Sequence, residues 1–235
     1  MDSYHPPSYH MPRLLCGAVP TLARMEPGPV AEEGGEPTGR SVAAVAVTPA
    51  QRERRRRIVR AALELLTEHT YDSIQIRDVA LRADVALGTL YRYFPSKEQL
   101  FANVMLEWAS RFDEVVRRRR PESADDAERL RALLRRAVRA FERNPNFVQL
   151  HAVLGASPDP AVGEAFSAYS DGFAAVLAEA VPDTDPSDVE VLVTLSNSLL
   201  DSLLRTWWLG RLPLRSVEEQ VDRAVDVMFS GVSRR

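Results

Sequence analysis

Cysteine and histidine are scarce in this chain, and their scarcity narrows the chemistry that it can perform. The 235 residues include one cysteine, Cys16, and four histidines. A single cysteine cannot form an internal disulfide, which fits a reducing cytoplasm. Only His69 and His151 follow residue 47, and no nucleophile has a base at motif spacing. We therefore expect no metal site, no cofactor and no enzyme active site.

Long apolar runs and a strong excess of one charge are also missing. No stretch approaches the roughly 18 apolar residues that a membrane-spanning helix needs. The apolar run at residues 14–19 lacks the length and the charged lead-in of a signal peptide. The formal net charge is −3, while 45% of the residues are hydrophobic and can form a sizeable core. These features are typical of a soluble, cytoplasmic protein without a membrane partner.

Residues 1–47 differ in kind from the rest of the chain. Prolines and glycines recur throughout this stretch, and its apolar residues show no period, so we expect a disordered extension. Order is expected to begin at Thr48, where Thr48, Pro49 and Gln51 suit the N-cap, the first helical position and the capping-box position of a helix. The apolar stripe of this helix ends near His69.

Two short apolar periods follow one another between residues 76 and 97. The first has helical spacing and comprises Ile76, Val79, Ala80 and Ala83. The second comprises Leu87, Leu90, Tyr91 and Phe94. Two helices joined by so short a turn must cross steeply, as in a helix-turn-helix. Pro95 ends the second helix, and Ser96 with Gln99 forms a capping box for the next one.

The residue types on the second helix indicate what it contacts. Thr89, Arg92 and Tyr93 lie off the apolar stripe and carry groups that bond phosphates and base edges. Gly88 costs a helix roughly 1 kcal/mol relative to alanine, and close approach to a DNA backbone would compensate. Lys97 opposes the dipole of the following helix but suits a phosphate clamp. The alternative is a helical hairpin that binds no nucleic acid.

The run from Gly88 to Leu100, GTLYRYFPSKEQL, strongly resembles the helix-turn-helix signature of the TetR family of bacterial transcriptional regulators. Residues 58–71 look like the first helix of that family. The resemblance implies that the family's DNA-contacting positions are occupied here by Thr89, Tyr91, Arg92, Tyr93 and Lys97. We expect the ring of Tyr91 to pack inward and its hydroxyl to reach a phosphate.

An arginine cluster precedes the motif. It contains one acid, Glu53, among Arg52, Arg54, Arg55, Arg56, Arg57 and Arg60. Such a cluster is usually a solvated face, but beside a helix-turn-helix it indicates a salt-sensitive contact with phosphates. We take Arg54, Arg55 and Arg77 as further candidate contacts to a double-stranded operator.

The rest of the chain predicts helices alone, at residues 96–119, 125–143, 147–154, 160–180, 187–210 and 216–231. Pro121 would stop the first of these. The expected fold is all-α, with a three-helix DNA-binding domain at 48–95 and a larger ligand-binding and dimerisation domain at 96–235. Because one recognition helix reads too few base pairs, we expect a homodimer on a palindromic operator. The candidate interface residues are Leu192, Leu195, Leu199, Leu203, Val217, Val221, Val225 and Met228, although both stripes could instead fill the core of one chain.

The larger domain is rich in aromatic residues that could line an apolar cavity with a few polar groups. The candidates are Trp108, Phe112, Phe141, Phe147, His151, Tyr169, Phe173, Asn197, Asp201, Trp207 and Trp208. Within the TetR family the sequence looks most like regulators of steroid breakdown. That resemblance implies an apolar effector such as a steroid CoA thioester or another acyl-CoA thioester.

Our hypothesis is a repressor that an effector releases from DNA, with the helix at 96–119 carrying the displacement to the DNA-binding domain. Two alternatives stay open. A constitutive DNA-binding protein would have no well-formed cavity in its larger domain, and an activator is not distinguished from a repressor by the sequence.

Overall fold

The computed structural model describes residues 48–118 and 125–231, and the side chains of all of these except 113–118. Every regular element in these ranges is helical, which confirms the all-α expectation. The elements are α1 (Pro49–Glu68), η1 (Tyr71–Ser73), α2 (Ile76–Arg82), α3 (Leu87–Tyr93), α4 (Lys97–Arg118), α5 (Asp126–Arg143), α6 (Asn146–Gly155), α7 (Pro160–Glu179), α8 (Pro186–Trp208) and α9 (Leu214–Ser230). The expected extension at 1–47 and the stop at Pro121 lie outside the described residues.

Helix starts follow the predicted capping chemistry closely. The Thr48 hydroxyl accepts from the Gln51 amide at 3.2 Å, and the Gln51 side chain accepts from the Thr48 amide at 2.8 Å, which is the predicted capping box. The second predicted box is only half correct. Ser96 accepts from the Gln99 amide at 3.1 Å, but the Gln99 side chain donates to Asp159 at 2.8 Å instead. Gln99 therefore ties α4 to the start of α7.

The turn between α2 and α3 is a Schellman motif. The amide of Asp84 donates to Leu81 and that of Val85 to Ala80, at 3.2 and 3.0 Å. This geometry places Asp84 at φ 52°, a left-handed conformation that glycine adopts most easily. The interruption of the apolar pattern at Asp84 and Val85 is thus a specific helix stop that sets the crossing of α2 and α3.

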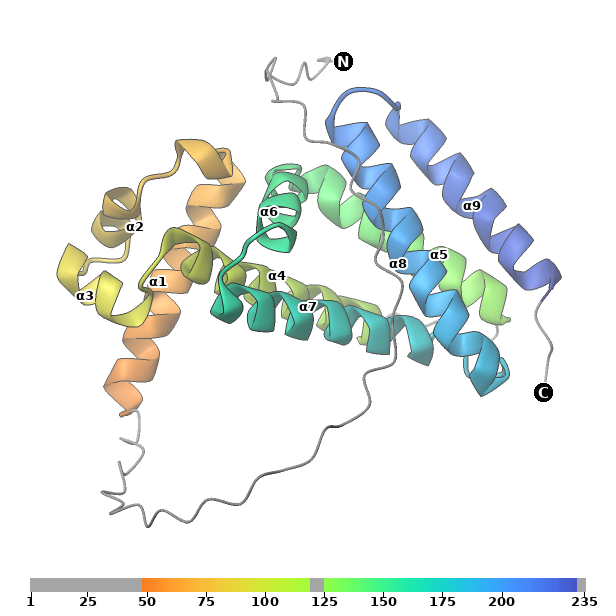
Figure 1. Ribbon diagram of the computed structural model, residues 1–235, viewed down its shortest axis with the longest axis horizontal. Helices are drawn as coiled ribbons and strands as arrows, with labels where there is room; N and C mark the ends of the chain where they lie inside the picture. The colour runs from red at the N-terminus through yellow and green to blue at the C-terminus, as the bar shows by residue number, and fades with distance from the viewer. Residues whose placement is uncertain (1–47, 119–124, 232–235) are drawn as a thin grey trace, which may run out of the picture.

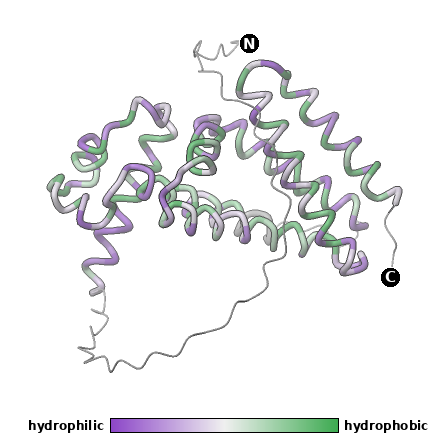
Figure 2. The backbone as a smooth tube through the Cα atoms, viewed as in Figure 1, coloured by the Kyte–Doolittle hydropathy of each residue, from purple (hydrophilic) through white to green (hydrophobic). Residues whose placement is uncertain are grey.

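The helices form a small head, α1 to α3, beside a larger body, α5 to α9, and α4 joins the two (Figure 1). The body side of α4 lies along α7, and its first turns pack on α1. Green, hydrophobic residues recur along α4 and α7, whereas the first turns of α1 are purple and hydrophilic (Figure 2). Because α4 packs on both units, the division between residues 95 and 96 stays a prediction.

A ladder of ion pairs holds α9 against α5. Arg131 pairs with Asp226 at 2.5 Å, Arg139 with Glu218 at 3.6 Å, and Arg135 binds Asp222 through two nitrogens. Successive arginines four residues apart on α5 thus meet successive acids four residues apart on α9. The ladder gives α9 partners within its own chain.

Most residues of the predicted dimer stripes lie in the core of a single chain, which is the alternative that the sequence left open. Val217, Val221 and Val225 of α9 are fully buried against α5 and α8, and Leu192 and Leu203 of α8 are also buried. A side chain without accessible surface in one chain cannot add surface to an interface. Among the predicted set, Leu195 is 46% exposed, while Leu199 and Met228 are half-buried. None of the described helices combines the length and apolar character needed to cross a bilayer.

The left-handed Asp84 gives the first prediction. Asp84→Gly should raise the free energy of unfolding by up to about 1 kcal/mol, because glycine adopts this conformation without steric cost. Asp84→Val should lower it by more than 1 kcal/mol, roughly, because a β-branched residue is strained there. Urea denaturation of the two variants measures both changes, and equal midpoints would show that this turn is not strained.

Candidate nucleic-acid interface and internal pocket

The buried side of α3 is rotated relative to the predicted apolar stripe. Leu90 and Phe94 are buried as expected, but Tyr91 is 46% exposed and Leu87 is also exposed. The predicted inward packing of the Tyr91 ring is therefore wrong. Tyr93 is instead half-buried and packs against the core. Seven residues make only two helical turns, and the stripe follows Leu90 and Tyr93 rather than Leu87 and Tyr91.

The solvent side of α3 offers an unobstructed approach to its backbone. Arg92 is exposed and Thr89 half-buried. A Cβ added at Gly88 would have no atom outside its own helix within 4 Å. No contact with another element of the head therefore requires glycine at this position.

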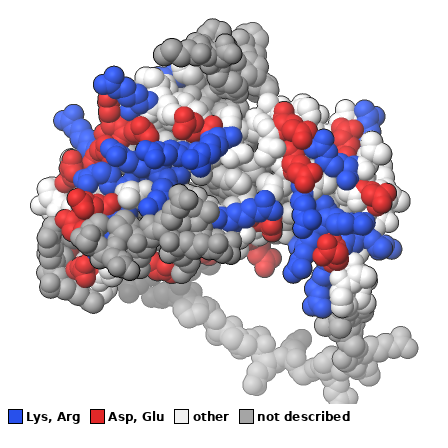
Figure 3. All heavy atoms as spheres, turned by 180° about the vertical axis from the view of Figure 1, so that it is seen from behind, with Lys and Arg blue, Asp and Glu red and all other residues white. Residues whose placement is uncertain are grey.

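The arginines of α1 form a basic surface, seen at the lower right in Figure 3. All residues from Thr48 to Arg57 are exposed, Arg54 among them. Arg55 also has an internal role, since its guanidinium lies 5.1 Å from the centre of the Phe94 ring and donates to the Asn103 side chain of α4. Arg77 of α2 is exposed, with Asp78 beside it at 3.8 Å.

Lys97 has a partner that the sequence argument did not foresee. Its ammonium donates to the Tyr71 carbonyl at 2.5 Å and lies 4.1 Å from the centre of the Tyr71 ring. Burial lowers the pKa of Lys97 from its usual value. The contact with Tyr71 thus gives Lys97 a role within the protein, in addition to the predicted phosphate contact.

A cavity of about 310 Å³ lies between α5, α6, α7 and α8. Six of the candidate residues meet there, namely Phe141, His151, Tyr169, Phe173, Asn197 and Asp201. The sequence reasoning missed the other lining residues, which are Val148, Ala152, Phe166, Ser170, Ser198, Leu200, Leu204 and Arg205. Of these, Phe166 alone could have been predicted from the sequence, because it is an aromatic residue one helical turn before Tyr169.

The remaining aromatic candidates lie elsewhere. Trp108 and Phe112 border a neighbouring space of about 20 Å³, and Phe147 is fully buried beneath Trp108, their ring centres 4.7 Å apart. Trp207 and Trp208 line a separate hollow of about 330 Å³ at the turn from α8 to α9. The single aromatic cavity expected from the sequence is therefore divided into three regions.

One side of the main cavity is apolar and the other polar. His151 meets the edges of Phe166 and Tyr169, with ring centres 4.9 and 5.6 Å away. Its Nδ1 lies 3.3 Å from an Asp201 oxygen, and this contact lowers the pKa of the Asp201 carboxyl. An ionised Asp201 favours a proton on Nδ1, which leaves Nε2 of the neutral ring as a hydrogen-bond acceptor.

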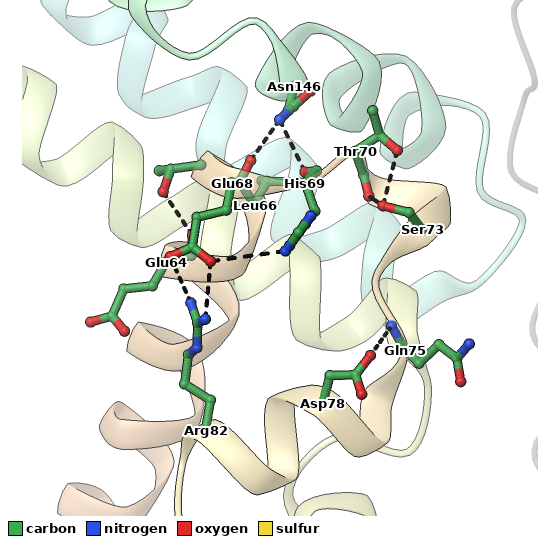
Figure 4. Close-up of polar contacts among 11 residues, drawn as sticks. Glu64, Leu66, Glu68, His69, Thr70, Ser73, Gln75, Asp78, Arg82 and Asn146 are labelled. Carbon is green, nitrogen blue, oxygen red and sulfur yellow. Dashed lines mark hydrogen bonds and ion pairs between the residues drawn. The ribbon is translucent and has the colours of Figure 1, made fainter.

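Two amide side chains of α6 bind the head. Asn146 donates to the carbonyl oxygens of Leu66 and His69 at 2.9 and 3.0 Å, as Figure 4 shows. Gln149 accepts from the Tyr71 amide at 3.2 Å and donates to Asp72 at 2.7 Å. The end of α1 and the start of η1 are thus held by the body.

No group of three or more His, Cys, Asp or Glu residues within the described part of the chain could hold a metal ion. In that part of the chain, His151 and Asp201 have no third such residue beside them. The described residues offer two candidate binding features, an exposed basic head and a cavity between α5, α6, α7 and α8.

Comparisons with known proteins match both parts of the chain. A family model described as "Bacterial regulatory proteins, tetR family" matches residues 58–104. A second, "Tetracyclin repressor-like, C-terminal domain", matches residues 124–228.

Curated relatives match along most of their length. The transcriptional repressor KstR of Rhodococcus jostii is 31% identical over 188 residues, which cover 79% of this chain and 87% of the relative. KstR of Mycobacterium tuberculosis is 33% identical over 184 residues, which cover 77% and 82%. Both relatives are named as HTH-type transcriptional repressors.

Solved structures show the same fold. A TetR transcriptional regulator from Rhodococcus sp. RHA1 has a TM-score of 0.66 at 29% identity, covering 78% of this chain and all of that one. FadR from Bacillus subtilis, solved in complex with stearoyl-CoA, has a TM-score of 0.60 at 20% identity, covering 72% and 96%. At that identity, the second match supports the fold alone.

A substitution at Gly88 can distinguish an effect on stability from an effect on DNA binding. Gly88→Ala should keep or raise the melting temperature, since alanine favours a helix and meets no neighbour. The same methyl group should weaken binding to duplex DNA at least tenfold, roughly the cost of 1.4 kcal/mol, because it stands where a backbone approaches. Calorimetry and a fluorescence-anisotropy titration on one preparation measure the two effects.

Gly172→Ala is the matched control, because this helical glycine of α7 also has open space around its Cβ position and lies far from α3. It should leave DNA affinity unchanged. Wild-type affinity in Gly88→Ala would rule out a close backbone approach at α3.

Proposed function

This chain belongs to the TetR family of bacterial regulatory proteins, and we propose that it represses transcription in the cytoplasm as a homodimer that an apolar effector releases from a palindromic operator. The observation that carries the DNA-binding part is the exposed face of α3, with Arg92 and Tyr91 outward and open space at Gly88. These side chains supply a guanidinium and a phenol for base edges and phosphates.

The other candidate DNA contacts differ in how much of each side chain is free to reach DNA. Thr89 and Tyr93, both half-buried, lie at the rim of the contact, and Arg54 and Arg77 face phosphates from α1 and α2. Arg55 and Lys97 act mainly inside the protein, through Phe94 and Tyr71. Any phosphate contact that they make adds to this internal role.

The exposed face of α8 supports dimerisation. Val191 and Leu195 are 55% and 46% exposed, and Ser198 and Ser202 continue the same face without charge. Val227 of α9 is also exposed. Large apolar side chains beside small ones allow two helices to approach closely, and a two-fold dimer would place two recognition helices on a palindrome. The proposed interface thus keeps Leu195 and, at its edge, Leu199 and Met228.

The cavity supports a sensor over a constitutive DNA-binding protein, because a protein without an effector needs no such space in its body. We propose a steroid or acyl-CoA thioester as the effector. The similarity to the KstR repressors and the fold shared with FadR, which was solved with stearoyl-CoA, motivate this class. The apolar part would lie against Phe166, Tyr169 and Phe173, and His151 could accept a hydrogen bond from an effector hydroxyl.

Release follows if the effector binds one arrangement of the two heads better than the other. A shift from 1:99 to 99:1 between them requires about 5.5 kcal/mol of differential affinity. A bulky apolar molecule in a cavity between four helices can supply such a difference through contacts that only one arrangement permits.

A charged residue placed in the proposed interface tests whether the protein dimerises through it. Leu195→Arg should convert the dimer to monomers, because two copies of the arginine would lie at the centre of an apolar interface. Sedimentation velocity measures the change in mass. Leu81→Arg is the matched control, since Leu81 of α2 is 83% exposed and lies outside the proposed interface. A dimer that survives Leu195→Arg would place the interface elsewhere.

The effector class can be tested with an operator selected from a random duplex library. Stearoyl-CoA or lithocholoyl-CoA should weaken operator binding at least tenfold, roughly, which is within the usual range of allosteric coupling. Tyr169→Ala should raise the concentration of thioester needed, because the apolar wall is reduced. Native mass spectrometry should show one thioester per chain, and release without binding, or binding without release, would contradict the proposal.

A further inference from the structure

The first half of α1 carries a dense positive charge, which we call the arginine surface; its members are Arg52, Arg54, Arg55, Arg56, Arg57 and Arg60. All six side chains are exposed, and they gather at the lower right of Figure 3. The first turn of α1 holds no acidic residue, so the partial positive charge of the helix N-terminus adds to theirs. The arginine surface therefore attracts an anionic partner whether or not DNA is present.

Several arginines of the body are paired with acids, whereas those of the arginine surface are not. Arg131 and Arg135 of α5 each meet a carboxylate of α9. Arg55 instead donates to the neutral side chain of Asn103. Among the side chains that the structure describes, no acid forms an ion pair with any member of the arginine surface. The surface thus keeps its positive charge for a partner from outside these residues.

A set of acids that could reach this surface lies shortly before α1 in the sequence. Residues 26–36, EPGPVAEEGGE, fall outside the described residues and contain four glutamates and no lysine or arginine. Twelve residues separate Glu36 from Pro49, a length that spans at most about 40 Å when extended. The arginine surface extends about 12 Å along α1. The connecting chain is therefore long enough for these glutamates to reach all of it.

We propose that residues 26–36 bind the arginine surface of their own chain in the absence of DNA and compete there with DNA phosphates. Carboxylates form short, charge-assisted hydrogen bonds with guanidinium groups, as phosphates do. A short connection holds the acids at an effective concentration on the order of millimolar, so ion pairs that are weak singly become populated. This inference rests on the proposed function, since it names a second partner for a surface that is proposed to contact an operator.

Competition between carboxylates and phosphates changes how DNA binding depends on salt. Each phosphate contact contributes about 0.9 to the slope of log affinity against log salt concentration. An arginine that first has to leave a glutamate contributes less, because salt weakens the pair that is lost as well as the pair that is gained. The glutamates should therefore lower the affinity for duplex DNA most at low salt and make its salt dependence shallower.

Neutralising the glutamates in the full-length protein tests the competition. The triple variant Glu32→Gln, Glu33→Gln, Glu36→Gln should bind a random duplex roughly tenfold more tightly than the wild type at 50 mM salt. The gain should fall to roughly two- to threefold at 200 mM, which makes the slope steeper by about 1. Fluorescence anisotropy over this range of salt measures both effects. Aspartate at the same three positions keeps the charge and should leave the wild-type affinity unchanged.

A matched control makes the same change of charge on the body. Glu128→Gln, Glu142→Gln and Asp171→Asn neutralise three exposed acids of α5 and α7. Like the first triple variant, this one raises the formal net charge from −3 to 0. It should change DNA affinity less than about twofold, because charges more than a Debye length apart are largely screened. Equal gains in the two variants would show a general effect of net charge and overturn the contact.

A second measurement detects the contact without DNA. Phenylglyoxal modifies accessible arginines, and peptide mass spectrometry should show Arg54 and Arg56 reacting several times faster in the glutamine variant than in the wild type at low salt. Arg211, exposed at the turn from α8 to α9, is the internal control and should react equally in both. Equal rates at Arg54 and Arg56 would overturn the contact. A difference in these rates without binding of any protein to duplex DNA would support the contact and contradict the proposed function.

Discussion

The contact that the rest of this structure depends on is the one that holds the segment after α1 against the body. Tyr71 lies at its centre, with its ring buried edge-on to Phe101 of α4, their centres 5.2 Å apart. Its carbonyl accepts from Lys97 and its amide donates to Gln149. Helices α4 and α6 thus both contact this one residue of η1. Burial of the phenol raises its pKa, which keeps it neutral at any physiological pH.

In the proposed function, this joint would let a small head respond to a distant cavity. The head is built around α1, and the end of α1 is bonded by α6 and paired with α2. A loosely tethered head would sample many orientations whatever the cavity contained. A head held at several points has few arrangements, so a ligand that prefers one of them changes how two recognition helices are spaced.

Local chemistry made much of the fold predictable. The capping box at Thr48, the N-caps at Asp125 and Asp185 and the proline after α3 are contacts within a few residues, and helix ends follow them. The predictions that failed were those that depend on which other helix covers a given face. Tyr91 and Tyr93 both fit an apolar stripe in so short a helix, and only packing against the rest of the core decides between them. Likewise, the valines of α9 look the same in sequence whether α5 or a second chain covers them.

In the candidate site, too, residues placed by helix periodicity were predicted, and residues placed by tertiary contacts were not. The aromatic residues of α7 and the polar residues of α8 were placed in the cavity because they share faces of long helices. Trp207 and Trp208 were misplaced because they lie in the last turn of α8, beyond Leu204 and Arg205, where they line a separate hollow at the turn to α9. The partners of Lys97 and Gln149 have no local signal, since they lie 26 and 78 residues away in the chain. Such pairs become visible only when the tertiary structure is known.

The central claim is that an effector changes the separation of the two heads, and distances between spin labels measure this most directly. After Cys16→Ser removes the one native thiol, Leu81→Cys places a label on the exposed surface of α2 in each protomer. Pulsed electron paramagnetic resonance then gives the distance between labels with and without the CoA thioester that releases the operator. The account predicts a shift of the whole distribution on binding. Identical distributions in the free and the saturated protein would contradict it.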